Sequence, residues 1–206
     1  SLLSLLKIEA KDTALEIWLE DKTFLEDFML VNQIKERCLI GIHPGVPSHG
    51  KARQWDKKNY AELSDRLQKG YKSRVVITGS SSETSLIQEI TKLMETKPII
   101  FVGKPLSQLT SLIRECKIFI CSNTGIMHLA SACGVPIIAL HGPTDPVKWG
   151  PFGEKNVVIQ SDLPCSPCLY LGFEYKCKKP KCMELITVNK VIEAVEGIIL
   201  DRCIQL

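Results

Sequence analysis

Short apolar runs alternate with amphipathic stretches along most of the chain. Each run is continuously hydrophobic and ends at glycine, proline or a small polar residue, which is typical of strands buried on both faces of a sheet. This pattern predicts strands at 38–43, 73–78, 98–102, 117–121, 136–140 and 157–159, and a weaker one at 15–19.

The stretches between these runs repeat apolar residues at the spacing of one helix face. In 57–68, Tyr60, Leu63 and Leu67 share such a face, and Gly70 follows as a stop signal. Helices are predicted at 23–32, 57–68, 82–94, 106–115, 125–133 and 187–200, with a loop rich in glycine and proline at 141–153.

Strands that alternate with helices of this length indicate βαβ units and a parallel sheet. Right-handed crossovers then give an α/β fold with a doubly wound parallel sheet of the Rossmann-like type. Ligands of such sheets bind beyond the carboxyl ends of the strands. The residues that follow each strand are therefore where chemistry is expected.

Four of the strand-end loops carry polar groups suited to a nucleotide. They lie at 43–55, 79–83, 122–128 and 141–146. Each one taken alone has an ordinary structural explanation, such as a helix cap, a solvated loop or a core histidine. Their shared position at one edge of one predicted sheet is the stronger indication.

The loop at 122–128 indicates an anion site. A strand leads to Asn123, Thr124 and Gly125, and a helix begins at once. The free N–H groups and positive dipole end of a helix start attract phosphate, and glycine lets it approach closely. His128 lies one turn further on, so its side chain can point back over the helix start.

Two other loops add complementary groups. Glu83 lies in the first turn of another helix beside Ser80, and a carboxylate there can accept both hydrogen bonds of a ribose diol. Lys51 and Arg53 supply cations for a pyrophosphate, which arginine engages through two hydrogen bonds. The complete predicted binding set is Lys51, Arg53, Ser80, Glu83, Asn123, Thr124, Gly125 and His128.

Composition adds few constraints. The 206 residues are 45% hydrophobic and 24% charged, which is ordinary for a soluble globular protein. A net charge of +3 is too small to indicate binding to nucleic acid. No window is apolar enough to span a bilayer, and no signal peptide is evident. We expect a soluble cytoplasmic protein with at most peripheral membrane association.

The nine cysteines fall into two main groups. Those in or beside apolar segments are expected to be buried thiols, and they are Cys38, Cys116, Cys121 and Cys133. A second group lies close together in the sequence, at Cys165, Cys168, Cys177 and Cys182. Its spacing permits a structural zinc ion, two disulfides or unpaired thiols, and the sequence leaves these alternatives open.

Several motifs occur in a characteristic order. Residues 122–132 read SNTGIMHLASA, and GVP at 134–136 and LHGPTDP at 140–146 follow. HPG at 43–45 is followed by Arg53, Trp55, Tyr60 and Leu63, and GS at 79–80 by Glu83. These segments resemble the signature of glycosyltransferase family 9, which contains the bacterial lipopolysaccharide heptosyltransferases. The resemblance extends over roughly 39–200.

The resemblance implies the C-terminal half of a GT-B glycosyltransferase, whose two Rossmann-like domains face each other across a cleft. This half binds the nucleotide-sugar donor, which is ADP-heptose in the best-known members. The N-terminal half binds a lipid-linked or saccharide acceptor and supplies the acidic base. Transfer in the family inverts the anomeric centre and needs no metal or other cofactor. We expect 1–34 to be a connector with the first elements of this half. Residues 35–206 are expected to form the donor-binding domain, with a Cys-rich loop at 165–182.

The resemblance also assigns roles by position. Arg53 takes a diphosphate-binding place usually held by lysine, and Glu83 takes the place that binds the nucleoside. The diphosphate and sugar places fall on Asn123, Thr124, Gly125 and His128. Asn123 departs from the family pattern, because aspartate is usual there, and the amide keeps hydrogen bonds but loses the charge. No catalytic residue is expected in this chain. The isolated chain is therefore expected to bind donor weakly and not to transfer sugar.

Other functions compete with this interpretation. A GT-B-type sugar-nucleotide epimerase shares the fold, and a non-catalytic nucleotide-binding module would keep the helix-start motif. A metal-binding redox protein would leave the strand-end loops unexplained. Titration with ADP, UDP and their sugar conjugates separates a glycosyltransferase or an epimerase from a pure nucleotide module, which would gain nothing from the sugar.

Overall fold

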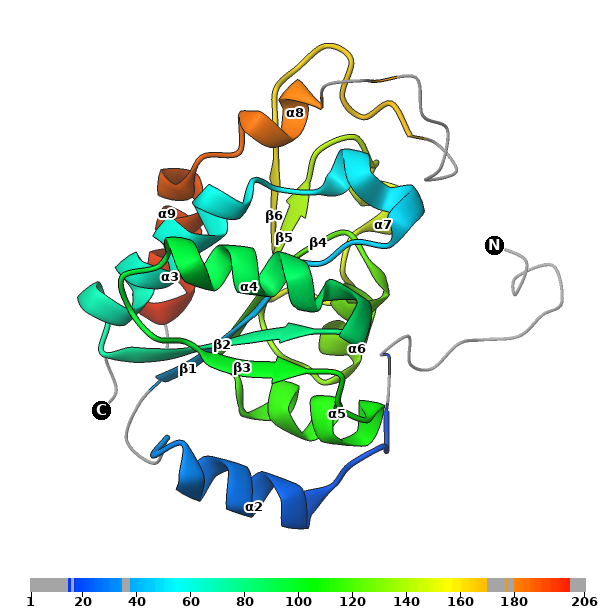
Figure 1. Ribbon diagram of the computed structural model, residues 1–206. Coiled ribbons are helices and arrows are strands. Elements are labelled where there is room, and N and C mark those ends of the chain that lie inside the picture. Colours follow the sequence, from blue (N-terminus) through cyan, green and yellow to red (C-terminus); the bar gives the residue numbers. More distant parts are fainter. Residues whose placement is uncertain (1–14, 16, 35–37, 170–176, 178–179, 201–206) are drawn as a thin grey trace, which may run out of the picture.

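The computed structural model describes residues 15, 17–34, 38–169, 177 and 180–200. Its centre is a six-stranded parallel sheet in the order β3-β2-β1-β4-β5-β6 (Figure 1). The strands are β1 (Cys38–His43), β2 (Ser73–Gly79), β3 (Ile99–Val102), β4 (Ile118–Ser122), β5 (Ile137–His141) and β6 (Val157–Gln160). The predicted doubly wound parallel sheet is confirmed.

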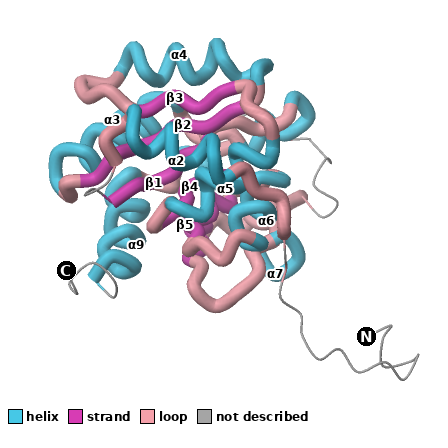
Figure 2. Tube along the Cα trace, turned by 90° about the horizontal axis from the view of Figure 1, so that it is seen from below, coloured by secondary structure: helices cyan, strands magenta, loops and turns pink. Residues whose placement is uncertain are grey.

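Helices cover both faces of the sheet (Figures 1 and 2). One face carries α3 (Lys57–Gly70), α4 (Thr84–Leu93) and α9 (Val188–Leu200). The other carries α5 (Leu106–Glu115) and α6 (Gly125–Ala132), with α2 (Lys22–Val31) packed against α5. None of the described helices has both the length and the apolar character needed to cross a membrane.

Alternate residues of each strand enter the two cores. In β1, Ile40 and Ile42 pack toward α3 and α9, while Leu39 packs on the opposite side with α5 and α6. All three side chains are almost completely buried. Strands buried on both faces need continuous apolar sequence, which explains why the hydrophobic runs located the strands so directly.

A buried indole joins distant parts of the first core. Trp55 is fully buried, and its Nε1–H donates to the backbone oxygen of Ile186 at 2.7 Å. Its ring meets the Tyr60 ring edge-on, with 4.9 Å between centroids. This contact ties the turn before α3 to the segment before α9.

The weak strand predicted at 15–19 is wrong, because the described residues there form no strand. Trp18 is 86% exposed, so the segment lacks the burial that its apolar residues suggested. Its backbone is held by side chains of α5 instead, through Arg114 donating to the oxygen of Ile17 and Ser111 accepting from the N–H of Asp21.

Short helical turns account for the other differences. The helix predicted at 82–94 is divided into the 3-10 turn η2 (Ser81–Glu83) and α4. The loop predicted at 141–153 contains α7 (Pro146–Trp149), which Asp145 caps and Pro146 begins. The Cys-rich segment contains α8 (Lys181–Glu184), and the 3-10 turn η1 (Ser48–Arg53) follows β1.

The direction of winding reverses between β1 and β4, which lie side by side in the sheet. Ligands of doubly wound sheets bind at this reversal, outside the carboxyl ends of the strands. Here β1 ends at His43 and β4 ends at Ser122, and His43 pairs with Cys121 in the register. The loops after these two strands are therefore neighbours.

Two glycines, one in the sheet and one in a helix, allow a test of how tightly the structure is packed. Gly41 lies in β1, where an added Cβ would overlap the ring of Phe119, whereas no atom lies within 4 Å of an added Cβ at Gly197 in α9. We expect Gly41→Ala to lower the free energy of unfolding by about 1–3 kcal/mol through overpacking. Gly197→Ala should raise it by about 0.5–1 kcal/mol through helix propensity. Urea denaturation of both variants measures the difference, and equal stabilities would contradict this account.

Candidate functional site

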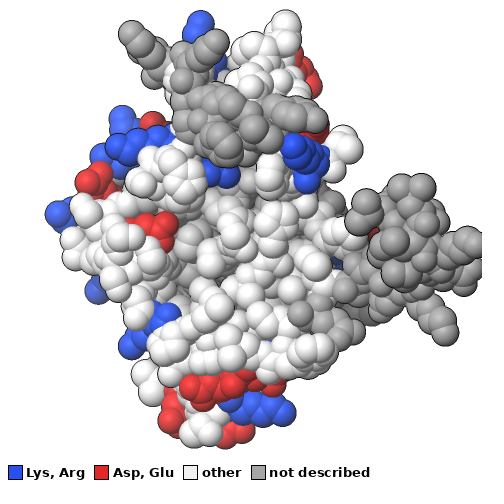
Figure 3. Space-filling model, turned by 90° about the vertical axis from the view of Figure 1, so that its right-hand side faces the viewer, with Lys and Arg blue, Asp and Glu red and all other residues white. Residues whose placement is uncertain are grey.

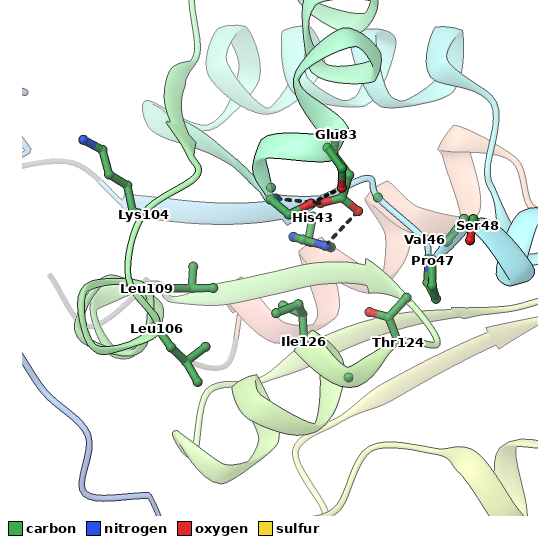
Figure 4. A pocket seen from close by; sticks show the side chains of 15 residues that line it. His43, Val46, Pro47, Ser48, Glu83, Lys104, Leu106, Leu109, Thr124 and Ile126 are labelled. Atoms are coloured by element: carbon green, nitrogen blue, oxygen red, sulfur yellow. Dashed lines mark hydrogen bonds and ion pairs between the residues drawn. The ribbon is translucent and has the colours of Figure 1, made fainter.

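A cleft of about 800 Å³ opens at the carboxyl edge of the sheet (Figure 4). Its walls come from the loops after four neighbouring strands: His43, Gly45, Val46, Pro47 and Ser48 after β1, Gly79, Ser80, Ser82 and Glu83 after β2, Lys104, Leu106 and Leu109 after β3, and Thr124, Gly125 and Ile126 after β4. This volume lies in the range that holds a drug-sized or nucleotide-sized ligand. Figure 3 shows the side of the molecule that lies to the right in Figure 1. Uncharged residues fill the centre of this side, and charged residues lie mainly toward its rim.

Glu83 is held in the cleft by its own helix start. Its Oε2 accepts from the N–H of Ser80 at 2.6 Å and from Ser80 Oγ at 2.7 Å, which completes a capping box. Its Oε1 lies so close to Gly45 that a Cβ on that glycine would overlap it. Glycine at 45 is thus needed for the carboxylate to occupy this place.

His43 lies beside this carboxylate at the base of the cleft. Its Nδ1 is 3.0 Å from Thr78 Oγ1, and its Nε2 is 3.8 Å from Glu83 Oε1. Burial lowers the pKa of His43, and the nearby carboxylate offsets only part of this effect. Near neutral pH the imidazole is therefore uncharged, and Glu83 keeps an oxygen for a ligand.

The start of α6 forms the opposite wall. Thr124 occupies the N-cap position, yet its hydroxyl makes no capping hydrogen bond, and its buried Oγ1 has no partner within the described part of the chain. In Figure 4 this hydroxyl points toward the cleft. The first N–H groups of a helix also lack partners within the helix. Together with the backbone of Gly125, these groups form a cradle for an anion.

Arg53 lies next to this cradle. The side chain is buried, and its Nη1 donates to the backbone oxygen of Asn123 at 2.9 Å. Its Nε is buried without a partner among the described residues. Gly50 makes room for the guanidinium, because a Cβ there would lie 2.6 Å from Nη2. A buried cation with an unsatisfied donor beside a helix start suits a negatively charged ligand.

The far end of the cleft is apolar. Leu106 and Leu109 of α5 and Ile126 of α6 line it, and Lys104 lies above them (Figure 4). The loop after β3 is not one of the four loops predicted to bind a nucleotide, so these residues were not expected at the site. The rule that ligands bind at strand ends applied equally to that loop and would have indicated Lys104.

The structure places the eight predicted binding residues in different settings. Four line the cleft: Ser80, Glu83, Thr124 and Gly125. Arg53 and Asn123 are buried and bonded to each other beside it. Lys51 is exposed on η1, and His128 is half-buried in the first turn of α6.

Two histidines near the start of α6 are uncharged. Burial lowers the pKa of His128 and lowers that of His141 to about 4. His141 ends β5, is fully buried, and has its Nδ1 3.3 Å from Thr144 Oγ1. The positive charge near the cradle therefore comes from Arg53 and the helix dipole rather than from imidazolium groups.

The zinc site that the four clustered cysteines would permit is not found among the residues that the structure describes. Within the described residues, no three His, Cys, Asp or Glu side chains gather closely enough to hold a metal ion. Cys165 is exposed on its loop, whereas Cys182 is buried in α8 with its Sγ near Gly142. Burial raises the pKa of Cys182, and Cys168 and Cys177 add to this effect, so these three thiols lie near one another.

The low pKa of His141 predicts a stability change with pH. Because its folded pKa of about 4 lies below the usual 6.5, the unfolded chain takes up the proton first as the pH falls. The stabilisation is complete above pH 6.5 and is lost toward pH 4, by at most about 3 kcal/mol. Denaturant unfolding of the wild type and His141→Gln at several pH values should show a smaller loss in the variant. Identical pH dependence would contradict the prediction.

The sequence profile of glycosyltransferase family 9 (heptosyltransferase) matches residues 6–179. Among curated proteins, lipopolysaccharide heptosyltransferase 2 of Escherichia coli K12 is 34% identical over 180 residues, covering 81% of this chain. Lipooligosaccharide heptosyltransferase 2 of Campylobacter jejuni serotype O:2 is 27% identical over 168 residues, covering 78%. The chain spans about half the length of these relatives, 48% and 51% respectively.

Solved structures agree with the sequence relatives. The glycosyl transferase family 9 protein of Veillonella parvula superposes with a TM-score of 0.81 at 25% identity, covering 97% of this chain and 58% of that one. The E. coli ADP-heptose LPS heptosyltransferase II superposes with a TM-score of 0.72 at 25% identity, covering 90% and 54%. The family resemblance of the motifs is confirmed, and the chain belongs to glycosyltransferase family 9, the heptosyltransferase family.

Proposed function

We propose that these residues form the donor-binding domain of an inverting glycosyltransferase that acts in lipopolysaccharide or related glycan synthesis. The donor is a nucleotide sugar of the ADP-heptose type. The observation that carries the proposal is the cleft itself, which presents a fixed carboxylate on one wall and an open helix start on the other.

The cleft suggests how a nucleotide sugar lies in it. The diphosphate is expected at the start of α6, on Thr124, the N–H of Gly125 and the guanidinium of Arg53. The ribose diol then meets Glu83, whose Oε1 is not used by Ser80. The base enters the apolar end between Leu109 and Ile126.

This arrangement favours departure of a nucleoside diphosphate. When the bond from the anomeric carbon to the diphosphate oxygen breaks, negative charge develops on that oxygen. Helix N–H groups and a buried arginine fixed in advance stabilise such charge most effectively. We therefore infer that the chain's contribution to transfer is stabilisation of the leaving group, and that it needs no metal for this.

The relatives support this choice of substrate. They are heptosyltransferases of lipopolysaccharide and lipooligosaccharide, and one solved relative is called ADP-heptose LPS heptosyltransferase II. We propose a cytoplasmic site of action, with a lipid-linked or saccharide acceptor and peripheral contact with the membrane. The exposed Lys51 and the half-buried His128 are proposed to contact the sugar end of the donor.

Substitutions of Glu83 test the ribose contact. We expect Glu83→Gln to weaken ADP binding about 10-fold, which is about 1.4 kcal/mol, because the amide loses a charged acceptor. Glu193→Gln on the exposed surface of α9 is the matched control and should bind as the wild type does. Gly45→Ala should weaken binding as well, because its Cβ displaces the carboxylate without removing it. Isothermal titration calorimetry at one salt concentration measures the ADP affinity of the wild type and of the three variants.

The substrate offers a complementary test of the same contact. The wild type should bind 2′-deoxy-ADP more weakly than ADP, whereas Glu83→Gln should distinguish the two only slightly. Such non-additivity marks groups that interact directly. An equal preference for ADP in both proteins would place the ribose elsewhere.

The sugar contribution tests the proposal against a simple nucleotide-binding module. We expect ADP-heptose to bind about 10-fold more tightly than ADP, since the sugar adds hydrogen bonds at the start of α6. We also expect the 206-residue chain to bind the donor without transferring sugar to a lipopolysaccharide-core acceptor. Equal affinity for ADP and ADP-heptose would favour a nucleotide module, and measurable transfer would refute the expectation about catalysis.

A further inference from the structure

Asn123 does not line the cleft, although it directly precedes the proposed diphosphate cradle. The residue is buried, with a relative exposure of only 4%. It contacts three segments that are distant in sequence: η1 through Arg53, the end of β5 through His141, and the end of α7 through Trp149. Asn123 is thus a junction between the loops that surround the start of α6.

The contacts define the orientation of the amide. Nδ2 donates to the backbone oxygen of Trp149 at 2.7 Å and lies 3.4 Å from Nε2 of His141. Oδ1 faces the guanidinium of Arg53, at 3.4 Å from Nη1. An amide nitrogen has two hydrogens and its oxygen only accepts. Reversing the group would place oxygen against oxygen at Trp149 and nitrogen against the arginine.

His141 must accept a hydrogen bond in this arrangement. Its Nδ1 faces Thr144, so a proton on Nδ1 leaves the lone pair of Nε2 for Asn123. The charged groups around the imidazole are Arg53 from η1 and Asp145 from the following loop, and His128 of α6 also faces it. Burial dominates these influences and keeps the pKa low, at about 4. The neutral ring therefore offers at Nε2 the hydrogen-bond acceptor that the NH₂ group of Asn123 needs.

A carboxylate at position 123 would not fit the same surroundings. One of its oxygens would face the carbonyl of Trp149 and the lone pair of His141, and neither group donates a hydrogen bond to it while the His141 proton stays on Nδ1. A carboxylate would also neutralise the guanidinium of Arg53, whose Nε still lacks a partner among the described residues. The imidazole could donate to this carboxylate and keep its proton toward Thr144 only by taking up a second proton.

We propose that Asn123 is a positioning residue. Its amide, matched to an accepting Nε2 on His141, holds the Arg53 turn and the α7 loop together beside the start of α6 and leaves the charge of Arg53 free for the ligand. Asn123 thus acts through Arg53 and the loop, rather than by touching the sugar. The inference rests on the proposed function for its effect on binding, but its hydrogen-bond pattern can be tested without any ligand.

The first test is the titration of His141 in the 206-residue chain. We expect Asn123→Asp to raise the pKa of His141 from about 4 to about 6 or above, because a carboxylate at hydrogen-bonding distance favours the imidazolium. NMR of the imidazole nitrogens measures the pKa and the tautomer directly. Asn189→Asp makes the same chemical change on the surface of α9 and should leave His141 unchanged.

The second test is ADP affinity as a function of pH. The ratio of the dissociation constants of Asn123→Asp and the wild type cancels the titration of ADP itself. We expect this ratio to be about 10 at pH 8 and to fall as His141 becomes protonated, because the imidazolium re-forms the hydrogen bond. The double variant N123D/H141Q should lose this pH dependence, because a glutamine amide can donate to the introduced carboxylate at every pH.

Two results would overturn the inference. One is a pKa of His141 that does not change in N123D, with the variant folded by its NMR spectrum. The other is an N123D variant that binds ADP as the wild type does and loses affinity only for ADP-heptose, which would make residue 123 a direct sugar contact. If the wild type binds no nucleotide, the proposed function fails, while the titration of His141 still decides whether Asn123 holds the network as described.

Discussion

The pairing of β1 with β4 is the constraint on which the site depends. These strands come from opposite halves of the winding, and their parallel register sets His43 beside Cys121. The chain leaves both strands at the same edge, so the glycine-containing turn after β1 meets the helix start after β4. Buried apolar residues on both faces maintain this register, because a shift of one residue would turn every side chain to the opposite core. The geometry of the cleft therefore follows from the packing of the sheet.

The fold was largely predictable because its strands carry continuous apolar sequence and its main helices have clear periodicity. The strand at 15–19 failed for a physical reason. A hydrophobic run indicates burial, but Trp18 is exposed and the backbone of the segment is held by α5. The one-turn helices α7 and α8 escaped prediction because a few residues show no period. Asp145 followed by Pro146 was the available sign of α7, since this pair supplies a cap and a first helical residue.

The binding site was predictable to the level of the loops but not of the individual contacts. Glu83 and Thr124 follow strands and open helices, so their place at the strand-end edge follows from topology. Topology cannot say which side chains of a loop face the ligand, and Asn123 turned inward to a network of protein groups. Nothing in the sequence pairs residue 123 with residues 53, 141 and 149, because that pairing depends on how three loops pack in space. Lys104 was accessible to the same topological rule and was overlooked with its loop.

The indole of Trp55 makes the cleft depend on a segment that follows all six strands of the sheet. Its partner, the backbone oxygen of Ile186, lies 131 positions later in the sequence. Arg53 is only two residues before this anchor, so the turn that carries the guanidinium is secured by a segment that the ribosome makes after the whole sheet. A nascent chain that has completed β1 to β5 would already contain the helix start of α6 and the Asn123 contacts of Arg53, but not the hydrogen bond that anchors Trp55. The last contact that secures the arginine turn can therefore form only after the segment around Ile186 has been synthesised and has folded back against the sheet.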